Sequence, residues 1–458
     1  MSKLIIIQFC NLWYLFSILC AQSINLSPEL TCQYESASEQ YSIENLSIRD
    51  YELTIKGEYT SSKMYILAHM GYHLIDGMNG IPSDFTREQG LHWFEHSPGI
   101  ADDQRNYYVA NMKLQYGDSA SFFYFNKWNQ HWGPGINSLT ISNKIPSFPH
   151  FGFKWKLHQN IHFEYFHGKL KSGITDNLYA EYESMNRPLD IVRNIAGHRL
   201  EWQPCNQIIL SGSELISYAN RSIETIYLLP FMPFFPIQTY IGETDNVIMS
   251  GDIQYLPNEN IRMYGVFLVD EWSPPYTFDK DNRNWFGWQA GFEKKKFFLP
   301  ISSLRLEYTW TDHRIYRHRF QVNDFYSYTY PVGFWAGPHA EELYLDYRFT
   351  LSKNHIKFLY SNAKRGELTD KMLEDQYNRP NNNQPIYERF SNTIERKQVL
   401  SISLTRSITE RLFLNISYTY VDWKNAGNRI NTETSELILK DGTDMIKHSI
   451  GFGIRYRY

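Results

Sequence analysis

Long hydrophobic runs are nearly absent from this chain of 458 residues. Only 42% of its residues are hydrophobic, whereas a membrane protein built of helices needs about 20 consecutive apolar residues for every span. The one long run, residues 4–19, follows Lys3 and precedes Cys20 and Ala21, which is the pattern of a secretory signal peptide. We therefore expect residues 1–21 to be removed by cleavage after Ala21, with lipidation of Cys20 as the alternative.

Cysteines are also few, and the net charge is small. Of the four cysteines, only Cys32 and Cys205 remain after removal of the leader, and in an exported chain they could pair or stay separate thiols. The formal net charge is only −4 and there is no basic tail, which argues against a nucleic-acid partner. No spacing typical of a metal site is present, so we predict neither a metal nor another cofactor.

Enzyme motifs are missing as well. The sequence contains no nucleophile elbow, no HExxH and no paired acidic motif. We therefore expect that the protein is not an enzyme. A membrane-embedded hydrolase is kept as a less favoured alternative, because a triad on a barrel need not show in sequence.

The chain has, instead, a repeated alternation of polar and apolar residues. In its last segment the apolar positions are Ile450, Phe452, Ile454, Tyr456 and Tyr458, and the residues between them are Gly or Arg. Successive side chains of a strand point to opposite faces, so each such segment predicts a strand with one apolar face. Further examples lie at 151–157, 304–310, 343–349, 400–405 and 411–420.

The number and composition of these segments predict an all-β fold, a large transmembrane antiparallel β-barrel. We count about 16–18 segments, and a sheet of that size needs closure to remove its edges. Aromatic residues form 16% of the chain, which suits the aromatic girdles of such barrels. We assign 22–50 to an N-terminal periplasmic segment and 51–458 to the barrel; a secreted sandwich or propeller is the alternative.

Connections of two lengths separate the predicted strands, as in outer-membrane barrels with short turns on one side and long extracellular loops on the other. LPNEN at 256–260 is a short turn. The connection 228–246 is too apolar for a solvated loop, so it is either a plug or a membrane-facing segment. The long connections are 71–104, 129–150, 169–195, 228–246, 270–284 and 361–394.

The densest group of candidate functional residues lies at 126–149. Trp128, His131 and Trp132 lead into the turn Gly133-Pro134-Gly135, and a serine-leucine strand, an asparagine and two prolines follow. This stretch resembles the capsule assembly protein Wzi family of Gram-negative outer membranes, whose members carry a WGPG turn in the same setting.

The resemblance continues through three later segments. Residues 197–216 resemble the strand pair that follows in the family, and 244–272 resemble its hairpin, with Asp245 and Asn246 in corresponding places. Residues 307–320 resemble a further segment, although Trp310 stands where a basic or polar residue is usual. The four matches together cover about residues 126–350.

The resemblance implies an eighteen-stranded barrel in the outer membrane of a Gram-negative bacterium. Such a barrel binds capsular or extracellular polysaccharide at its surface-exposed loops and helps to attach or assemble it, without catalysis. The implied partners are this polysaccharide, outer-membrane lipid and lipopolysaccharide, and the barrel-assembly machinery. That machinery would read a C-terminal signal formed by Phe452, Tyr456 and Tyr458.

Aromatic rings give large contact areas to a polymer, and arginine pairs with carboxylates in two-pronged fashion. The candidate polysaccharide-binding residues are Trp128, His131, Trp132, Asp270, Trp272, Tyr276, Arg314, Arg317 and Arg319. Each has a structural alternative: the tryptophans could pack the barrel, the acids could form salt bridges in the lumen, and the basic stretch 313–319 could be a solvated loop.

A porin or solute channel is the main functional alternative, because it would share the fold and the aromatic girdles. What separates the two is whether the lumen is open or filled by inward loops.

Overall fold

The computed structural model describes residues 24–38, 47–78, 83–91, 101–176, 189–272, 274–276, 284–372 and 388–458. The predicted signal peptide lies outside this part of the chain. Within the described ranges, no helix is long and apolar enough to cross a membrane.

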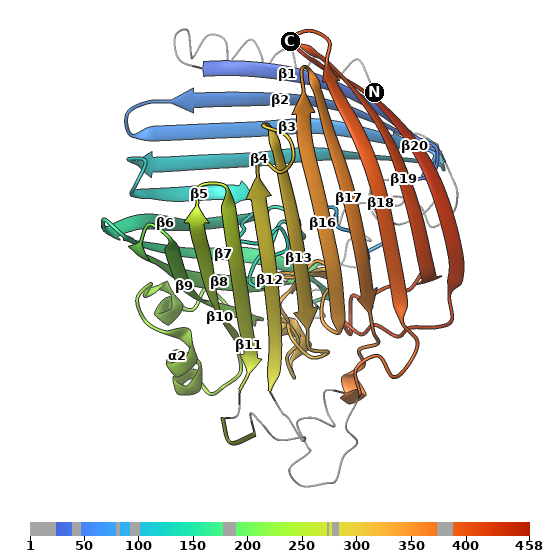
Figure 1. Cartoon of the computed structure of the whole chain (residues 1–458). Helices are drawn as coiled ribbons and strands as arrows, with labels where there is room; N and C mark the ends of the chain where they lie inside the picture. The colour runs from blue at the N-terminus through green and yellow to red at the C-terminus, as the bar shows by residue number, and fades with distance from the viewer. Residues whose placement is uncertain are drawn as a thin grey trace.

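Eighteen strands form a single antiparallel sheet that closes on itself, because β1 pairs with both β2 and β20 (Figure 1). The predicted all-β barrel is confirmed. The first strands are β1 (Ile24–Glu35), β2 (Ile48–Thr60), β3 (Met64–Asp76), β4 (Gln104–Gly117), β5 (Phe122–Trp128), β6 (Phe148–His158), β7 (Ile161–Thr175), β8 (Asp190–Cys205) and β9 (Ile208–Ala219). The others are β10 (Asn246–Asn258), β11 (Ile261–Glu271), β12 (Trp285–Lys295), β13 (Ser302–Thr311), β16 (Ala340–Leu351), β17 (Asn354–Arg365), β18 (Glu395–Ser407), β19 (Leu412–Ala426) and β20 (Thr443–Arg457).

The small elements lie in the connections. In the described part of the chain they include the helix α2 (Phe234–Ile241), the 3-10 turns η3 (Thr225–Leu228), η4 (Pro274–Tyr276) and η5 (Gln321–Asn323), and the short hairpin of β14 (Tyr326–Ser327) with β15 (Tyr330–Pro331).

The first strand corrects one prediction. Residues 22–50 were assigned to a segment preceding the barrel, but Ile24–Glu35 is β1 and pairs along its length with β2. Pro28, which lacks a backbone N–H and usually argues against a strand interior, obscured its alternation. Cys32 lies on this strand and Cys205 ends β8, and the two are separate thiols.

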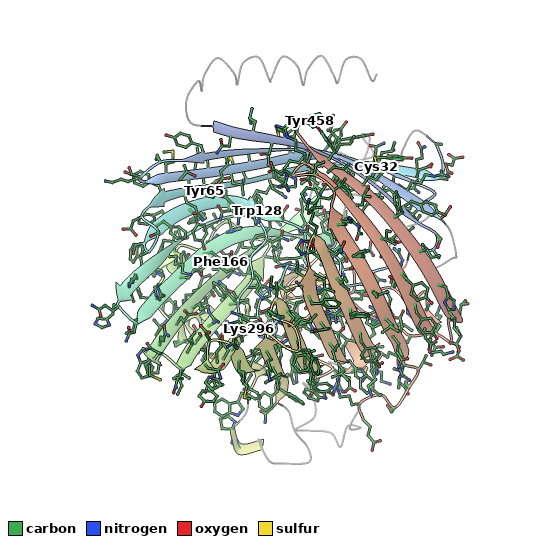
Figure 2. All side chains as sticks on the ribbon, turned by 45° about the horizontal axis from the view of Figure 1, so that its top comes forward. Cys32, Tyr65, Trp128, Phe166, Lys296 and Tyr458 are labelled. Carbon is green, nitrogen blue, oxygen red and sulfur yellow. The ribbon has the colours of Figure 1, made fainter. Side chains whose placement is uncertain are left out.

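The two faces of the wall follow the predicted parity. On β20, Ile450, Phe452 and Ile454 are exposed on the outer face, whereas Lys447 and Ser449 are buried on the lumen side. Tyr458, labelled in Figure 2, donates its backbone N–H to Pro28 O at 2.9 Å, so the chain end is attached to the first strand.

Short turns and long connections lie at opposite ends of the barrel. The predicted turn around 256–260 joins β10 to β11, and the start of β1 and the end of β20 lie at this same short-turn end. The predicted long connections fall between strands at the other end, together with 312–339 and 427–442.

Several long connections fold into the lumen. Side chains from 83–91, 129–147, 312–339 and 427–442 form one hydrophobic core with lumen-facing residues of the wall, among them Phe166, which Figure 2 labels. The loop residues of this core are Phe85, Trp132, Leu139, Ile141, Ile145, Ile315, Tyr316, Phe325, Tyr326, Tyr330, Val332, Phe334, Trp335, Ala336, Leu368, Ile430, Leu437 and Leu439.

The apolar connection 228–246 takes no part in this core. Residues 228–245 belong to a longer segment, residues 220–245, which we call the outer flap and which lies against the outside of the barrel beside β8, β9 and β10 (Figure 1). Of the two predicted alternatives for this connection, the plug is therefore wrong.

Candidate functional site

The WGPG turn is built by its backbone. Gly133 has φ +110°, a conformation that side chains other than glycine rarely adopt. Ser138 closes the turn: its Oγ donates to Trp132 O and accepts the backbone N–H groups of Thr140 (3.1 Å) and Ile141 (3.2 Å). Gly135 is required for space, because a Cβ there would lie 2.7 Å from Glu307 Oε2 and nearer still to Gln289 Oε1.

Two buried carboxylates of the wall hold this turn in the lumen. Glu307 on β13 accepts the backbone N–H groups of Ile136 (2.8 Å) and Asn137 (3.0 Å) and the hydroxyl of Tyr264 (2.5 Å). Glu342 on β16 accepts the amide of Asn137 at 2.9 Å. Hydrogen bonds to ionised acceptors are the stronger kind, so these carboxylates fix the position of the turn.

Glu342 also joins the turn to two other lumen loops. It accepts Trp335 Nε1 at 2.7 Å and forms an ion pair with Arg87. Arg87 in turn donates to Asn137 Oδ1 at 3.0 Å. The three loops thus form one connected network.

Within the basic stretch 313–319, Arg314 and Arg317 fit neither predicted role, a polymer grip or a solvated loop, whereas Arg319 is exposed. Arg314 pairs with Asp312 at 2.8 Å, and Arg317 pairs with Asp324 at 3.0 Å and Asp370 at 2.9 Å. Both arginines are buried. Each guanidinium is neutralised inside the barrel, so neither is available to an anionic polymer.

Charged groups beside these loops have shifted pKa values. Burial by itself would raise the pKa of Asp312, but His313 and Arg314 stabilise its carboxylate and hold the pKa at about 2. Burial lowers the pKa of Lys144 to about 7. The Lys144 ammonium donates to Thr86 O and, at 3.0 Å, to Glu88 O, which ties 83–91 to the turn.

The three aromatic candidates before the turn lie in different environments. Trp132 is buried and packs edge-on against Phe166 with ring centroids 5.1 Å apart, so its ring is part of the lumen core. Trp128 is half-buried, with Lys113 Nζ 4.5 Å from its ring. His131 is exposed and its Nε2 is bonded to Gly135 O at 3.0 Å.

Other candidates are divided between burial and the rim. Asp270 is buried and accepts the backbone N–H of Tyr316 at 2.5 Å. Trp272 is 55% exposed, Arg319 is exposed and donates to Glu243 O at 2.6 Å, and Tyr276 ends η4. The structure therefore does not bring the nine candidates into one surface.

The motif residues Asp245 and Asn246 are both buried where the outer flap joins β10. Asp245 forms a two-pronged ion pair with Arg221, with one N–O distance of 2.8 Å, and accepts Tyr227 Oη at 2.6 Å. The predicted salt bridge with arginine is present, but it belongs to the flap and not to the lumen.

A cavity lies between the described lumen loops and the wall. It has a volume of about 250 Å³ and is lined by hydroxyl groups of β17 to β20 and by cations. Its polar lining includes Arg87, Lys357, Ser361, Lys397, Ser401, Ser417, Thr419 and Ser449. Among the described residues no group of His, Cys, Asp and Glu has the arrangement of a metal site.

Sequence reasoning missed the residues that organise the site. Nothing near Glu307 in sequence indicates the turn that it holds, 171 positions away. The same is true of Glu342. Arg365, which pairs with Asp84 and Glu395, falls within the predicted long connection 361–394 but ends β17.

These features define a class: a closed antiparallel β-barrel of the outer-membrane type whose lumen is filled by its own long loops. No family model matches the sequence, and no curated protein matches it. The family resemblance seen in the sequence therefore stays a prediction.

Solved structures similar to this chain include Wzi of Escherichia coli, an outer membrane protein involved in group 1 capsule assembly and a carbohydrate-binding β-barrel. The identity is 11% and the TM-score 0.58, over 97% of this chain and 86% of that chain. OccAB2 of Acinetobacter baumannii has 8% identity and a TM-score of 0.48, over 95% and 97%. OprD of Pseudomonas aeruginosa has 9% and 0.45, over 95% and 94%. At 11% identity, the similarity to Wzi shows the fold alone.

Proposed function

We propose that this protein is an outer-membrane barrel that binds capsular or extracellular polysaccharide and holds it at the cell surface without catalysis. The observation that carries the proposal is the filled lumen: the described long loops meet the wall in one hydrophobic core. A channel needs a continuous aqueous path, whereas a surface anchor does not.

The contacts between the lumen loops and the wall support the same conclusion. Breaking the Glu307 and Glu342 contacts would leave buried charges and backbone N–H groups without partners, which costs about 1–3 kcal/mol for each group. The loops are thus held in place, and the working surface is their outer rim. The similar Wzi barrel, which binds carbohydrate, is consistent with this role.

The direction of the barrel follows from its connections. In outer-membrane barrels the short turns face the periplasm and the long loops face outward. The long connections of this chain would then lie at the cell surface, with Trp272 and Arg319 at the rim. The start of β1 and the end of β20 would lie in the periplasm.

The test is a deletion of the gene with polysaccharide quantified separately on cells and in the medium. We expect polymer to be made as before but to move from cells to medium, and the wild-type gene to restore attachment. A Trp272→Ala gene should restore it only in part. Trp202→Ala is the matched control, because Trp202 is an exposed tryptophan on the outer face of β8.

Two results would contradict the proposal. Unchanged polymer distribution together with reduced uptake of a small solute would identify a channel. Steady ion conductance of the purified protein in a planar bilayer would point the same way, because the lumen loops would then not close the barrel.

A further inference from the structure

The outer flap contains a long stretch without charge. From Thr225 to Gly242 there is no Asp, Glu, Lys or Arg. Three prolines, Pro230, Pro233 and Pro236, lie in the middle of this stretch. Proline has no backbone N–H, so each removes a donor that would otherwise need a partner.

The flap packs on the outer face of the wall. Its buried residues Tyr227, Phe234 and Ile237 form a cluster with residues of β6 to β10. On those strands the neighbours of opposite parity belong to the lumen core, so the flap and the lumen core lie on opposite sides of the sheet. The wall residues of the flap cluster are Phe153, Phe163, Tyr165, Ala196, Ile216, Tyr218 and Val247.

The flap reaches far down the strands. Phe231 stacks on Phe163 with ring centroids 4.7 Å apart. Through the register, Phe163 lies opposite Leu200, and Leu200 lies opposite Gly212. Gly212 is seven residues from the rim end of β9, or about 23 Å along a strand. The flap therefore covers the part of the wall that a bilayer surrounds and is not confined to the rim.

Several polar groups of the flap and of the wall beneath it are hydrogen-bonded to each other. Glu214 on β9 accepts the backbone N–H of Phe234 at 2.8 Å and His198 Nε2 at 2.9 Å, which places a carboxylate at the first turn of α2. Tyr165 donates to Tyr227 O at 2.8 Å. Non-barrel backbone at membrane depth is tolerated only when its polar groups are satisfied in this way.

The opposite face of the flap is apolar. Six large side chains on it are between 37% and 84% exposed: Leu228, Leu229, Phe231, Met232, Phe235 and Tyr240. This face continues the exposed apolar belt of the neighbouring strands, which includes Leu157, Leu200, Trp202, Ile253 and Tyr255. Contact of such an apolar surface with water would be unfavourable.

We propose that the exposed face of the outer flap is embedded in the lipid acyl chains of the outer leaflet. The flap is then a lipid-facing second layer of the wall, which separates Glu214, His198, Arg221 and Asp245 from the hydrocarbon. The proposal rests on the membrane location given under the proposed function, and the occupant is lipid, not a second copy of the chain.

The experiment uses spin labels on the barrel without its leader, with Cys32 and Cys205 replaced by serine, reconstituted in phosphatidylcholine vesicles. Labels at Phe231→Cys and Phe235→Cys test the flap. A label at Ile450→Cys on the outer face of β20 is the lipid control, and one at Lys296→Cys, in an exposed turn, is the water control. Correct folding is checked by heat-modifiable migration on gels.

Relaxation by oxygen, which concentrates in lipid, is compared with relaxation by a water-soluble nickel chelate. We expect the flap labels to match Ile450, with a several-fold higher ratio of oxygen to nickel effect than Lys296. Flap labels in water with Ile450 in lipid would overturn the flap proposal and leave the membrane location standing. If the label at Ile450 is also in water, the membrane location itself is wrong. Dipolar coupling between the flap labels of two copies would show that the flap contacts a second copy of the chain and not lipid.

Discussion

The sharpest prediction concerns Glu307, which holds the WGPG turn. The substitution Glu307→Gln keeps the shape of the side chain but removes its charge. In the wild type, the backbone N–H groups of Ile136 and Asn137 donate to the two carboxylate oxygens of Glu307, at 2.8 and 3.0 Å. Glutamine has one acceptor oxygen, so its amide N–H group would point at one of these donors.

The expected cost follows from these contacts. A hydrogen bond to a charged acceptor contributes about 1.5–3 kcal/mol, and a buried donor left without a partner costs about 1–3 kcal/mol. One bond is lost and the other is weakened, so we expect the docked turn to lose about 3 kcal/mol. At about 1.4 kcal/mol per factor of ten, its opening equilibrium should rise about a hundredfold.

Amide hydrogen exchange of peptides within 129–147 measures this opening directly. Exchange should be about a hundredfold faster in Glu307→Gln, while peptides of β20 stay protected. The control is Glu201→Gln, since the Glu201 side chain is 40% exposed and its contact with Arg199 is 3.9 Å long. If both variants exchange like the wild type, Glu307 does not hold the turn and the reasoning is refuted.

Three further outcomes are expected. Gly135→Ala should lower the unfolding temperature, because the added methyl displaces hydrogen-bonded Gln289 and Glu307 at a cost of about 1–3 kcal/mol; Gly212→Ala, with no atom within 4 Å of the added carbon, should leave the melt unchanged. Cleavage by an added protease within 83–91 should slow from pH 7.5 to 9. The pKa of Lys144 is about 7 when it is buried, so over this pH range Lys144 binds a proton when the loops are released but not when they are docked. The docked state therefore becomes more stable as the pH rises. Lys144→Met should remove this dependence, and cleavage that slows equally in both would contradict it. Deletion of Tyr458 should reduce the amount of barrel in the outer membrane, measured by fractionation, and normal levels would count against its part in the C-terminal signal.

The strands were predictable wherever both faces are uniform. In residues 304–310 of β13 and 450–456 of β20, each outward residue is apolar and each inward residue is polar or small, so periodicity alone located these segments. β1 has the same alternation but was missed, because Pro28 interrupts it. The turn at Gly133 was also predictable, since its backbone conformation depends on residues within the turn.

The candidate site was less predictable, because its charges are neutralised by residues distant in sequence. Arg317 looked free in the stretch 313–319, yet one of its partners, Asp370, comes from the next long connection. Trp132 looked like a binding aromatic, yet the core closes around it. The sequence around a side chain indicates which groups it can bind, but not which residues it contacts in the folded chain.

The sequence by itself determined the barrel: which residues form strands, which face of each is apolar, and where turns separate them. These properties depend on a period of two along the chain. Only the tertiary structure decided which loops enter the lumen, that 220–245 turns outward, and that Glu307, Glu342 and Arg365 hold the loops in place. Closure of the sheet brings segments more than a hundred residues apart into contact, and no local pattern encodes those pairings.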